Sequence, residues 1–235
     1  MLKTFFNWST GKDSAMALYY LQKNNELSVE HLLTTINKHH NRVSMHGLRR
    51  ELFLKQVDSI GLPYSTVELP EQPSMEVYNR LMDKEVSTLK TQGFTDCGFG
   101  DIFLEDLRIY REKQLKGIKC HFPLWQRNTK DLYLEFVNLG FKAIVICING
   151  ELLDSSFVGR VLDHKFLQDL PDNVDPCGEH GEFHTFCYDG PIFSYPIEFE
   201  IGDKVLRQYN RPNGDTKDKI SYWFIDLEHK TVHNK

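Results

Sequence analysis

The chain has 235 residues, of which 40% are hydrophobic and 26% charged, as in soluble globular proteins large enough to bury a core. Its formal net charge is −5, and its basic residues are interleaved with acidic ones, which argues against a protein that binds nucleic-acid phosphates. The N-terminus shows no signal-peptide pattern, no apolar run reaches the length of a membrane span, and the five cysteines include no C-x-x-C pair. We therefore expect a cytoplasmic protein with reduced cysteines, no membrane contact and no nucleic-acid partner.

The first half of the chain alternates short apolar runs with amphipathic segments. The expected strands are residues 3–8, 31–36, 64–69 and 94–97, and the expected helices are 15–21, 48–60, 75–93 and 105–116, with a short apolar segment at 120–125. This alternation predicts an α/β fold with a doubly wound parallel sheet. In such sheets ligands bind beyond the carboxyl ends of the strands, at a switch point in strand order.

The second half shows a different pattern. We expect a helix that Thr129 caps and that runs to Gly140, a strand at 143–148 and a helix at 156–170. After Glu182 the pattern becomes strand-like. Here Gly202 and Asp203 predict a hairpin turn between strands 197–201 and 205–208, before a last strand at 221–227. We place a domain boundary near Gln126, which gives domains 1–125 and 126–235, the second a smaller α+β domain.

A turn that contains glycine joins the first strand to the first helix. It reads Ser9-Thr10-Gly11-Lys12-Asp13-Ser14. The first N–H groups of a helix lack internal partners, and its dipole places partial positive charge there, so this turn is a candidate anion site. Lys12 adds a full positive charge, the hydroxyls add hydrogen-bond donors, and Asp13 suits a magnesium ion or the orientation of Lys12. A Walker A loop is excluded because Phe6 stands where that motif needs glycine. A plain strand-to-helix turn with Ser9 as N-cap remains the alternative.

These six residues resemble the S-G-G-x-D-S signature of the N-type ATP pyrophosphatases, or PP-loop proteins. Further stretches resemble one branch of them, the diphthine–ammonia ligase family. They are residues 42–47 (RVSMHG), 100–106 (GDIFLED), 108–112 (RIYRE), and 175–185 (DPCGEHGEFHT) running on through 189–193 (DGPIF). The resemblance covers nearly the whole chain, and residues 122–125 and 175–185 favour a bacterial relative. It implies an adenine nucleotide alpha hydrolase-like (HUP-type) fold, with ATP bound by domain 1–125 and substrate by domain 126–235.

One position departs from the signature, whose second residue is usually glycine. Here it is Thr10. A β-branched residue at positive φ is an outlier, so we expect Thr10 at negative φ. The phosphate-binding nest would then depend mainly on Gly11.

The resemblance implies a reaction in two steps. ATP is cleaved to AMP and pyrophosphate while a substrate carboxylate takes the AMP, and ammonia then displaces AMP to leave an amide. The cofactors implied are ATP and Mg²⁺, and the partners are a small-molecule or protein-borne carboxylate and ammonia, with the oligomeric state open and a homodimer included. Diphthine is the acceptor only if the source makes diphthamide.

Site residues follow from the same resemblance. The expected catalytic residues are Lys12, Asp13, Glu182 and His184, and the expected magnesium ligands are Asp13 and Asp101. The expected nucleotide contacts are Ser9, Thr10, Gly11, Lys12, Asp13, Ser14, Thr35, Ile36, Ser44, Met45, Gly100 and Asp101. The expected substrate contacts are Asp175, Cys177, Gly178, Glu179, Gly181, Glu182, His184, Thr185, Arg108 and Arg111.

Several of these residues also have plainer interpretations. Asp101 could cap the next helix, and Arg108 and Arg111 could pair with neighbouring acids. Residues 175–185 could form a polar surface loop, or a zinc site from Cys177, His180 and His184, although that spacing fits no standard site. We expect the pair His39-His40 to lie in a solvated loop. Two alternative functions stay open at this point, namely an ATP sensor without turnover and a sulfur-transfer enzyme that modifies RNA.

Overall fold

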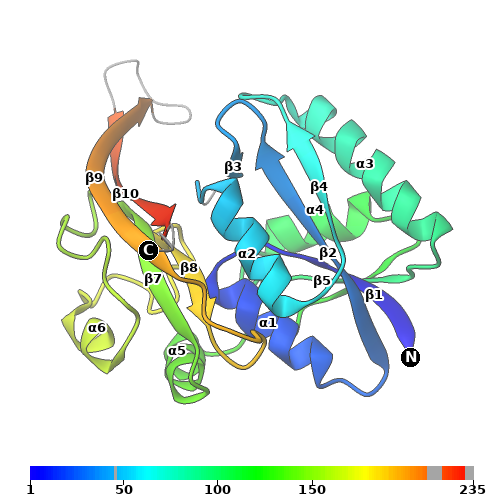
Figure 1. The fold of residues 1–235 in the computed structure, drawn as a ribbon, viewed down its shortest axis with the longest axis horizontal. Helices are drawn as coiled ribbons and strands as arrows, with labels where there is room; N and C mark the ends of the chain where they lie inside the picture. The colour runs from blue at the N-terminus through cyan, green and yellow to red at the C-terminus, as the bar shows by residue number, and fades with distance from the viewer. Residues whose placement is uncertain (45–46, 211–218, 231–235) are drawn as a thin grey trace, which may run out of the picture.

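The computed structural model describes residues 1–44, 47–210 and 219–230 and contains two β-sheets (Figure 1). The first sheet is mostly parallel, with its parallel strands in the order β4-β2-β1-β5-β6. These strands are β1 (Leu2–Asn7), β2 (Leu27–Asn37), β4 (Tyr64–Leu69), β5 (Asp96–Gly98) and β6 (Lys119–His121), and the short β3 (Arg42–Val43) pairs antiparallel with the end of β2. Strand order reverses at β1, which lies between β2 and β5.

Helices cover both faces of this sheet because consecutive residues of its central strands are apolar and point to opposite faces. They are α1 (Lys12–Gln22), α2 (Arg50–Ile60), α3 (Met75–Thr91) and α4 (Glu105–Gln114). Phe6 and Leu32 belong to the core cluster that contains α1 and α2, whereas Phe5 and Leu33 belong to a second cluster with buried residues of α3. The expected doubly wound parallel sheet is confirmed.

The second sheet is antiparallel, in the order β8-β7-β10-β9. Its strands are β7 (Lys142–Asn149), β8 (Phe183–Asp189), β9 (Phe199–Asn210) and β10 (Lys219–His229), and its helices are α5 (Thr129–Asn138) and α6 (His164–Asp169). The expected smaller α+β unit is therefore present. One core cluster joins the two halves, since it contains Phe6 as well as Ile144 and Phe183. The boundary near Gln126 stays a prediction.

The expected helix at 156–170 is wrong over its first part, because only His164–Asp169 is helical. The preceding segment lies beside β7 instead. Val145 donates to the carbonyl of Arg160 at 2.9 Å, and Leu162 donates to the carbonyl of Ala143 at 2.9 Å. Pairing with a strand uses the backbone groups that a helix would need. The helix begins only after Asp163, whose carboxylate accepts from the N–H of Phe166.

The expected hairpin turn at Gly202 and Asp203 is also wrong. β9 continues through both residues, and the pairing with β10 shifts there, from Lys204 opposite Ile225 to Ile201 opposite Leu227. The Gly-Asp pair thus marks a β-bulge. Glycine suits such bulges as well as it suits hairpin turns, so the sequence alone fits both. The connection between β9 and β10 falls at residues 211–218, outside the described residues.

Three smaller features complete the fold. Asn128, not Thr129, is the N-cap of α5, because its side chain accepts from the N–H of Asp131 at 3.1 Å and Thr129 is the first helical residue. All five cysteines are free, as expected. Within the described ranges, none of the helices combines the length and the apolar character that a membrane crossing requires.

Candidate functional site

The loop at Ser9–Ser14 follows the carboxyl end of β1, at the reversal of strand order (Figure 1). Gly11 is the N-cap of α1, with extended backbone angles (φ −90°, ψ 177°). The hydroxyl of Ser14 accepts from the N–H of Ser9 at 3.0 Å and closes the loop. The first N–H groups of α1 and its positive dipole end therefore lie at the switch point, where such sheets bind ligands.

Thr10 adopts φ 76°, so the expected negative φ is wrong. Thr10 is thus the residue of the loop with left-handed backbone angles, whereas Gly11 has a negative φ. Tertiary contacts impose this conformation. The carbonyl of Thr10 accepts from the N–H of Cys187 at 2.9 Å and from Nε2 of Gln56 at 3.0 Å, and Thr10 is fully buried. Strain of this kind persists only where the surroundings fix it, as they often do at binding sites.

Lys12 is buried beneath this loop, with 4% of its surface exposed. Its Nζ lies 2.7 Å from each carboxylate oxygen of Asp13 and also donates to the carbonyl of Cys177. Burial is the largest single influence and lowers the pKa of Lys12, but the charge of Asp13, its hydrogen bond to Lys12 and the smaller effects of Cys177 and Glu179 together raise the pKa above its ordinary value. Burial raises the pKa of Asp13, and the nearby carboxylates of Asp175 and Asp101 raise it further. Lys12 therefore stays cationic within a cluster of acids.

Residues 175–185 face the loop, as expected from the clustering of their reactive side chains. The hydroxyl of Thr185 accepts from the N–H of Lys12 at 3.1 Å, and the carbonyl of Cys177 accepts from its Nζ. One carboxylate oxygen of Glu179 accepts from the N–H groups of Ile102 at 3.3 Å and Phe103 at 2.8 Å. Residues 175–185 thereby connect the first turn of α1 with the segment after β5.

The carboxylates within residues 175–185 order the segment itself. Asp175 Oδ1 accepts from the N–H groups of Cys177 (2.8 Å) and Glu179 (3.3 Å). Glu182 is 2% exposed, and its two oxygens accept from the N–H groups of Asp175 (3.1 Å) and His180 (2.8 Å). A base at Glu182 would have to give up these bonds, so the geometry favours a positioning role. The catalytic role expected for Glu182 stays a prediction.

Glycine and histidine in the same segment fit this arrangement. Gly178 has φ 69°, and a Cβ there would lie 2.8 Å from the carbonyl oxygen of Phe183. Gly181 has φ 84°. Burial lowers the pKa of His184, and the charge of Lys12 lowers it further, so the imidazole is held neutral. A neutral imidazole has a nitrogen that can accept a proton, but a lowered pKa also makes it a weaker base, so the basic role expected for this residue stays a prediction.

No zinc site forms from this segment. The ligand atoms of Cys177, His180 and His184 do not gather into a group that could hold an ion. The thiol of Cys177 donates instead to the carbonyl of Thr129 at 3.3 Å, and burial raises its pKa to about 12.

The segment after β5 contacts the loop through Gly100. A Cβ there would lie 3.0 Å from the carbonyl carbon of Asp13 and from the N of Ser14, so a side chain would displace the loop. The next residue, Asp101, pairs with Arg111, whose Nε lies 2.8 Å from Oδ2 of Asp101. Asp13 pairs with Lys12 and Asp101 pairs with Arg111, so each expected magnesium ligand already faces a cation. The two carboxylates would therefore contribute little charge of their own to a metal site. They fit a Mg²⁺ ion that is held mainly by the phosphates of ATP, as Mg²⁺ usually is in nucleotide sites.

The two arginines expected to contact substrate both have partners. Arg111 pairs with Asp101 and lies over the ring of Phe99. Arg108 pairs with Glu112 at 3.0 Å and lies over the ring of Trp125. Arg108 thus has a hydrogen-bond partner in Glu112, whereas Nε of Arg111, although close to Asp101, is buried without a hydrogen-bond partner among the described residues. The roles of both arginines in substrate binding stay predictions.

A cleft of about 780 Å³ lies between the carboxyl edge of the first sheet and the face of β9 and β10. Thr35 and Ser44 line it, whereas Ile36 is buried in the core. The hydroxyls of Ser44 and Thr10 are buried and have no hydrogen-bond partner among the described residues. Both belong to the expected nucleotide contacts, and unpaired buried hydroxyls are costly unless a ligand satisfies them. Met45, a further expected contact, lies outside the described residues.

The sequence matches two domain models of one known protein family. Residues 2–118 match the Diphthamide synthase N-terminal domain, and residues 128–217 match the Diphthamide synthase C-terminal domain. The chain belongs to the diphthamide synthase family. The resemblance read from the sequence, to PP-loop diphthine–ammonia ligases, is confirmed.

Relatives of this diphthamide synthase family member include diphthine–ammonia ligases from animals and yeast. The chain is 38% identical to that of Bos taurus over 165 residues, which are 67% of this chain and 59% of the bovine protein. It is 34% identical to that of Homo sapiens over 88 residues, 35% of this chain and 33% of the human protein. It is 27% identical to that of Schizosaccharomyces pombe over 128 residues, 51% of this chain and 21% of the yeast protein. The chain thus spans less than two thirds of the length of these relatives.

Among solved structures, a predicted subunit of tRNA methyltransferase from Methanocaldococcus jannaschii shows 14% sequence identity and a TM-score of 0.38. The match covers 66% of this chain and 82% of that one. Similarity at this level supports no conclusion about function.

Sequence reasoning missed Gln56, which this diphthamide synthase family member uses to hold the PP-loop. Gln56 is fully buried; its Nε2 donates to the carbonyls of Thr10 and Cys187, and its Oε1 accepts from Trp8 at 3.2 Å. Its side chain therefore joins α2, β8 and the PP-loop. A signal was available, because an amide on the apolar face of an amphipathic helix must find buried partners.

Proposed function

We propose that the chain is an ATP-dependent amide ligase of the diphthine–ammonia ligase type. It cleaves ATP to AMP and pyrophosphate, activates a carboxylate as its adenylate, and transfers ammonia to that carbonyl. The observation that carries the proposal is the buried Lys12 at the N-terminus of α1, facing residues 175–185 across the switch point of the sheet. Pyrophosphate leaves from this point, where N–H groups and a cation stabilise its developing charge.

Each part of the site has a proposed role in that reaction. The loop from Ser9 to Ser14 binds the β- and γ-phosphates, with Lys12 as the cation and Asp13 orienting it. Mg²⁺, when bound, would screen phosphate charge next to Asp13 and Asp101. The cleft lined by Thr35 and Ser44 takes the adenosine.

Residues 175–185 form the acceptor side of the site in this proposal. Asp175 and Glu182 keep the segment in place, and Glu179 fixes it to the backbone after β5. His184, held neutral, accepts a proton from the attacking nitrogen as ammonia forms the amide bond and AMP leaves. The acceptor is a small or protein-borne carboxylate, diphthine among them, and we propose a cytoplasmic protein without a nucleic-acid partner.

Isotope transfer tests the reaction. When a carboxylate attacks the α-phosphorus, one carboxylate oxygen becomes bonded to that phosphorus. This oxygen stays with AMP when ammonia attacks the carbonyl carbon and AMP leaves. Carboxylated metabolites, and elongation factor that carries diphthine, are first screened as acceptors. The assay measures whether each of them stimulates pyrophosphate release. An acceptor labelled with ¹⁸O in its carboxylate should deliver one labelled oxygen to AMP. Stimulated pyrophosphate release with no label in AMP would contradict carboxylate adenylation.

A further inference from the structure

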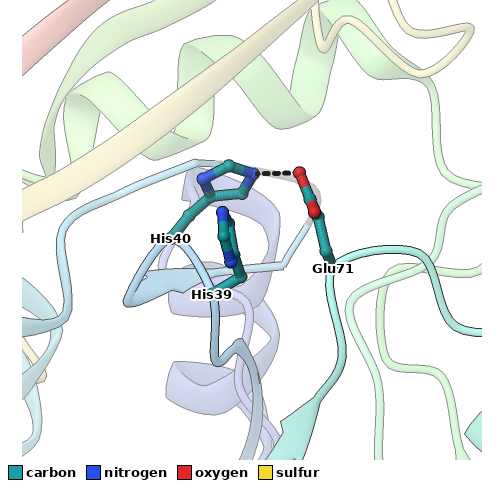
Figure 2. A group of neighbouring side chains, drawn as sticks. All are labelled: His39, His40 and Glu71. Atoms are coloured by element: carbon teal, nitrogen blue, oxygen red, sulfur yellow. Dashed lines mark ion pairs between the residues drawn. The ribbon is translucent and has the colours of Figure 1, made fainter.

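A group of two imidazoles and one carboxylate lies away from the PP-loop, at the rim of the cleft. His39 and His40 belong to the turn between β2 and β3, and Glu71 follows β4 (Figure 2). Their nearest ligand atoms all lie within 4.8 Å of one another. Within the described parts of the chain, no other three His, Cys, Asp or Glu residues come together in this way. His39 and His40 are exposed, so the expected solvated loop is confirmed.

The three side chains converge from two separate loops. His40 Nε2 lies 3.4 Å from Glu71 Oε1, and the rings of His39 and His40 have centroids 4.8 Å apart at 84° (Figure 2). His40 is 48% exposed and Glu71 51% exposed. Exposed side chains of this kind can rotate, so the ligand atoms can close on an ion without moving the backbone.

Asn37 at the end of β2 fixes the two loops relative to each other. Its Oδ1 accepts from the N–H of His40 at 3.1 Å, and its Nδ2 donates to the carbonyl of Glu71 at 3.1 Å. The N–H of Lys38 donates to the carbonyl of Leu69 at 2.8 Å. Both ligand-bearing loops are thus connected through their backbones before any ion binds, which lowers the entropic cost of assembling the site.

The donor set identifies the kind of ion. Imidazole nitrogen suits zinc and neighbouring transition metals, whereas Mg²⁺ and Ca²⁺ favour sites made wholly of oxygen. Two histidines and one carboxylate leave at least one position of a tetrahedral ion to water. This group is therefore chemically distinct from the expected magnesium site at Asp13 and Asp101.

We propose that His39, His40 and Glu71 bind one divalent transition-metal ion of the Zn²⁺ class. The ion connects the turn after β2 with the loop after β4. His40 and Glu71 line the same cleft as Thr35 and Ser44, so the ion fixes that rim of the cleft.

Metal titration of the full chain tests this proposal. Protein treated with a chelator is titrated with Zn²⁺ by calorimetry and with Co²⁺ by visible absorption. We expect one ion per chain. The affinity for the ion should fall at least about tenfold in His40→Ala and in Glu71→Gln, because loss of a residue that merely supports a metal ligand already lowers metal affinity by about this factor. His164→Ala is the matched control, because His164 is an exposed histidine on another element, the start of α6.

Stability provides a second readout that does not depend on catalysis. Saturating Zn²⁺ should raise Tm of the wild-type chain by roughly 5 °C and should not raise that of the double variant His39→Ala/His40→Ala. The variants change exposed residues, and their circular dichroism in the absence of metal should match the wild type. Equal Zn²⁺ affinity in the wild type and the double variant, or loss of binding in His164→Ala alone, would overturn the proposal.

Discussion

The two segments that meet at the end of β1 satisfy their polar groups in different ways. In residues 175–185 the carboxylates of Asp175, Glu179 and Glu182 all accept from backbone N–H groups. In the loop from Ser9 to Ser14, by contrast, the hydroxyl of Thr10 is buried and finds no hydrogen-bond partner in the described part of the chain. The first turn of α1 adds the buried cation of Lys12.

This difference separates positioning from chemistry. A carboxylate that already accepts two N–H bonds stabilises one loop conformation, and its removal should act first on folding. An unpaired buried hydroxyl is costly unless a ligand satisfies it, and the cation of Lys12, although paired with Asp13, lies at a helix N-terminus that favours anions. Removal of either should act first on ATP. Variants in the two segments should therefore differ in which property they change.

Lys12→Ala should give the largest effect on turnover. A charge-assisted contact is worth roughly 1.5–3 kcal/mol, so acceptor-dependent pyrophosphate release should slow at least about tenfold. Lys23→Ala, at an exposed lysine just beyond the same helix, is the control and should be close to wild type. Equal rates for wild type and Lys12→Ala would remove Lys12 from the reaction.

Glu182→Gln should act mainly on stability. The amide can accept one N–H bond but places its own N–H₂ against the other donor, which costs about 1–3 kcal/mol. Denaturant unfolding should show the loss, ATP affinity should be close to wild type, and amide formation should fall because the segment is less well placed. Glu200→Gln on the exposed strand β9 is the control. A variant with wild-type stability would contradict the positioning role.

Asp226→Asn examines a contact outside both segments that joins the two sheets. Asp226 on β10 pairs with Arg42 at 2.9 Å and with Arg49 at 2.6 Å. Although burial opposes it, hydrogen bonds from the two arginines lower the pKa of Asp226 to about 2. A depressed carboxyl pKa stabilises the fold above the unfolded value near 4, by about 2 kcal/mol here, and this contribution is lost as pH falls through about 2.

The difference in unfolding free energy between wild type and Asp226→Asn should thus be largest above pH 5 and shrink steadily between about pH 4 and 2. Chemical denaturation over this range measures it. A difference that does not change with pH would show that the pair of arginines contributes nothing through the charge of Asp226.

Thr10→Gly should give the smallest effect. Relief of the left-handed strain gains roughly 1–2 kcal/mol, and the added freedom of the unfolded chain offsets about 0.5–1 kcal/mol of it. Stability should therefore rise by up to about 1.5 kcal/mol. Thr10→Ala keeps the strain and should not be stabilised. Both variants lose the unpaired hydroxyl, so ATP affinity should fall alike in the two if that hydroxyl contacts phosphate.

The parallel half could be predicted from sequence because its signals are local. Each apolar run and each amphipathic stripe between Leu2 and Gln114 corresponds to an observed strand or helix. Thr10 was predicted wrongly because hydrogen bonds from Gln56 and Cys187 set its φ, and both residues are far along the chain.

Two predictions in the second half were wrong for the same reason. Residues before His164 carry a helical pattern, but β7 offers their backbone groups a closer set of partners. Gly202 and Asp203 allow a turn or a bulge equally, and only pairing with β10 decides between them. The sequence predicted that residues 175–185 face the PP-loop, because clustered ionisable groups indicate a site. It did not predict which carboxylates order the segment, because their N–H partners are brought together only by the folded backbone.

Product analysis of ATP cleavage tests the central claim most directly. The wild-type chain, Mg-ATP labelled at the α-phosphate, ammonia and a stimulating carboxylate are incubated, and the labelled nucleotide is identified. Cleavage between the α- and β-phosphates predicts labelled AMP in equal amount to pyrophosphate, with both formed at least about tenfold more slowly in Lys12→Ala. Labelled ADP as the sole product, with release of inorganic phosphate, would contradict adenylation by the PP-loop.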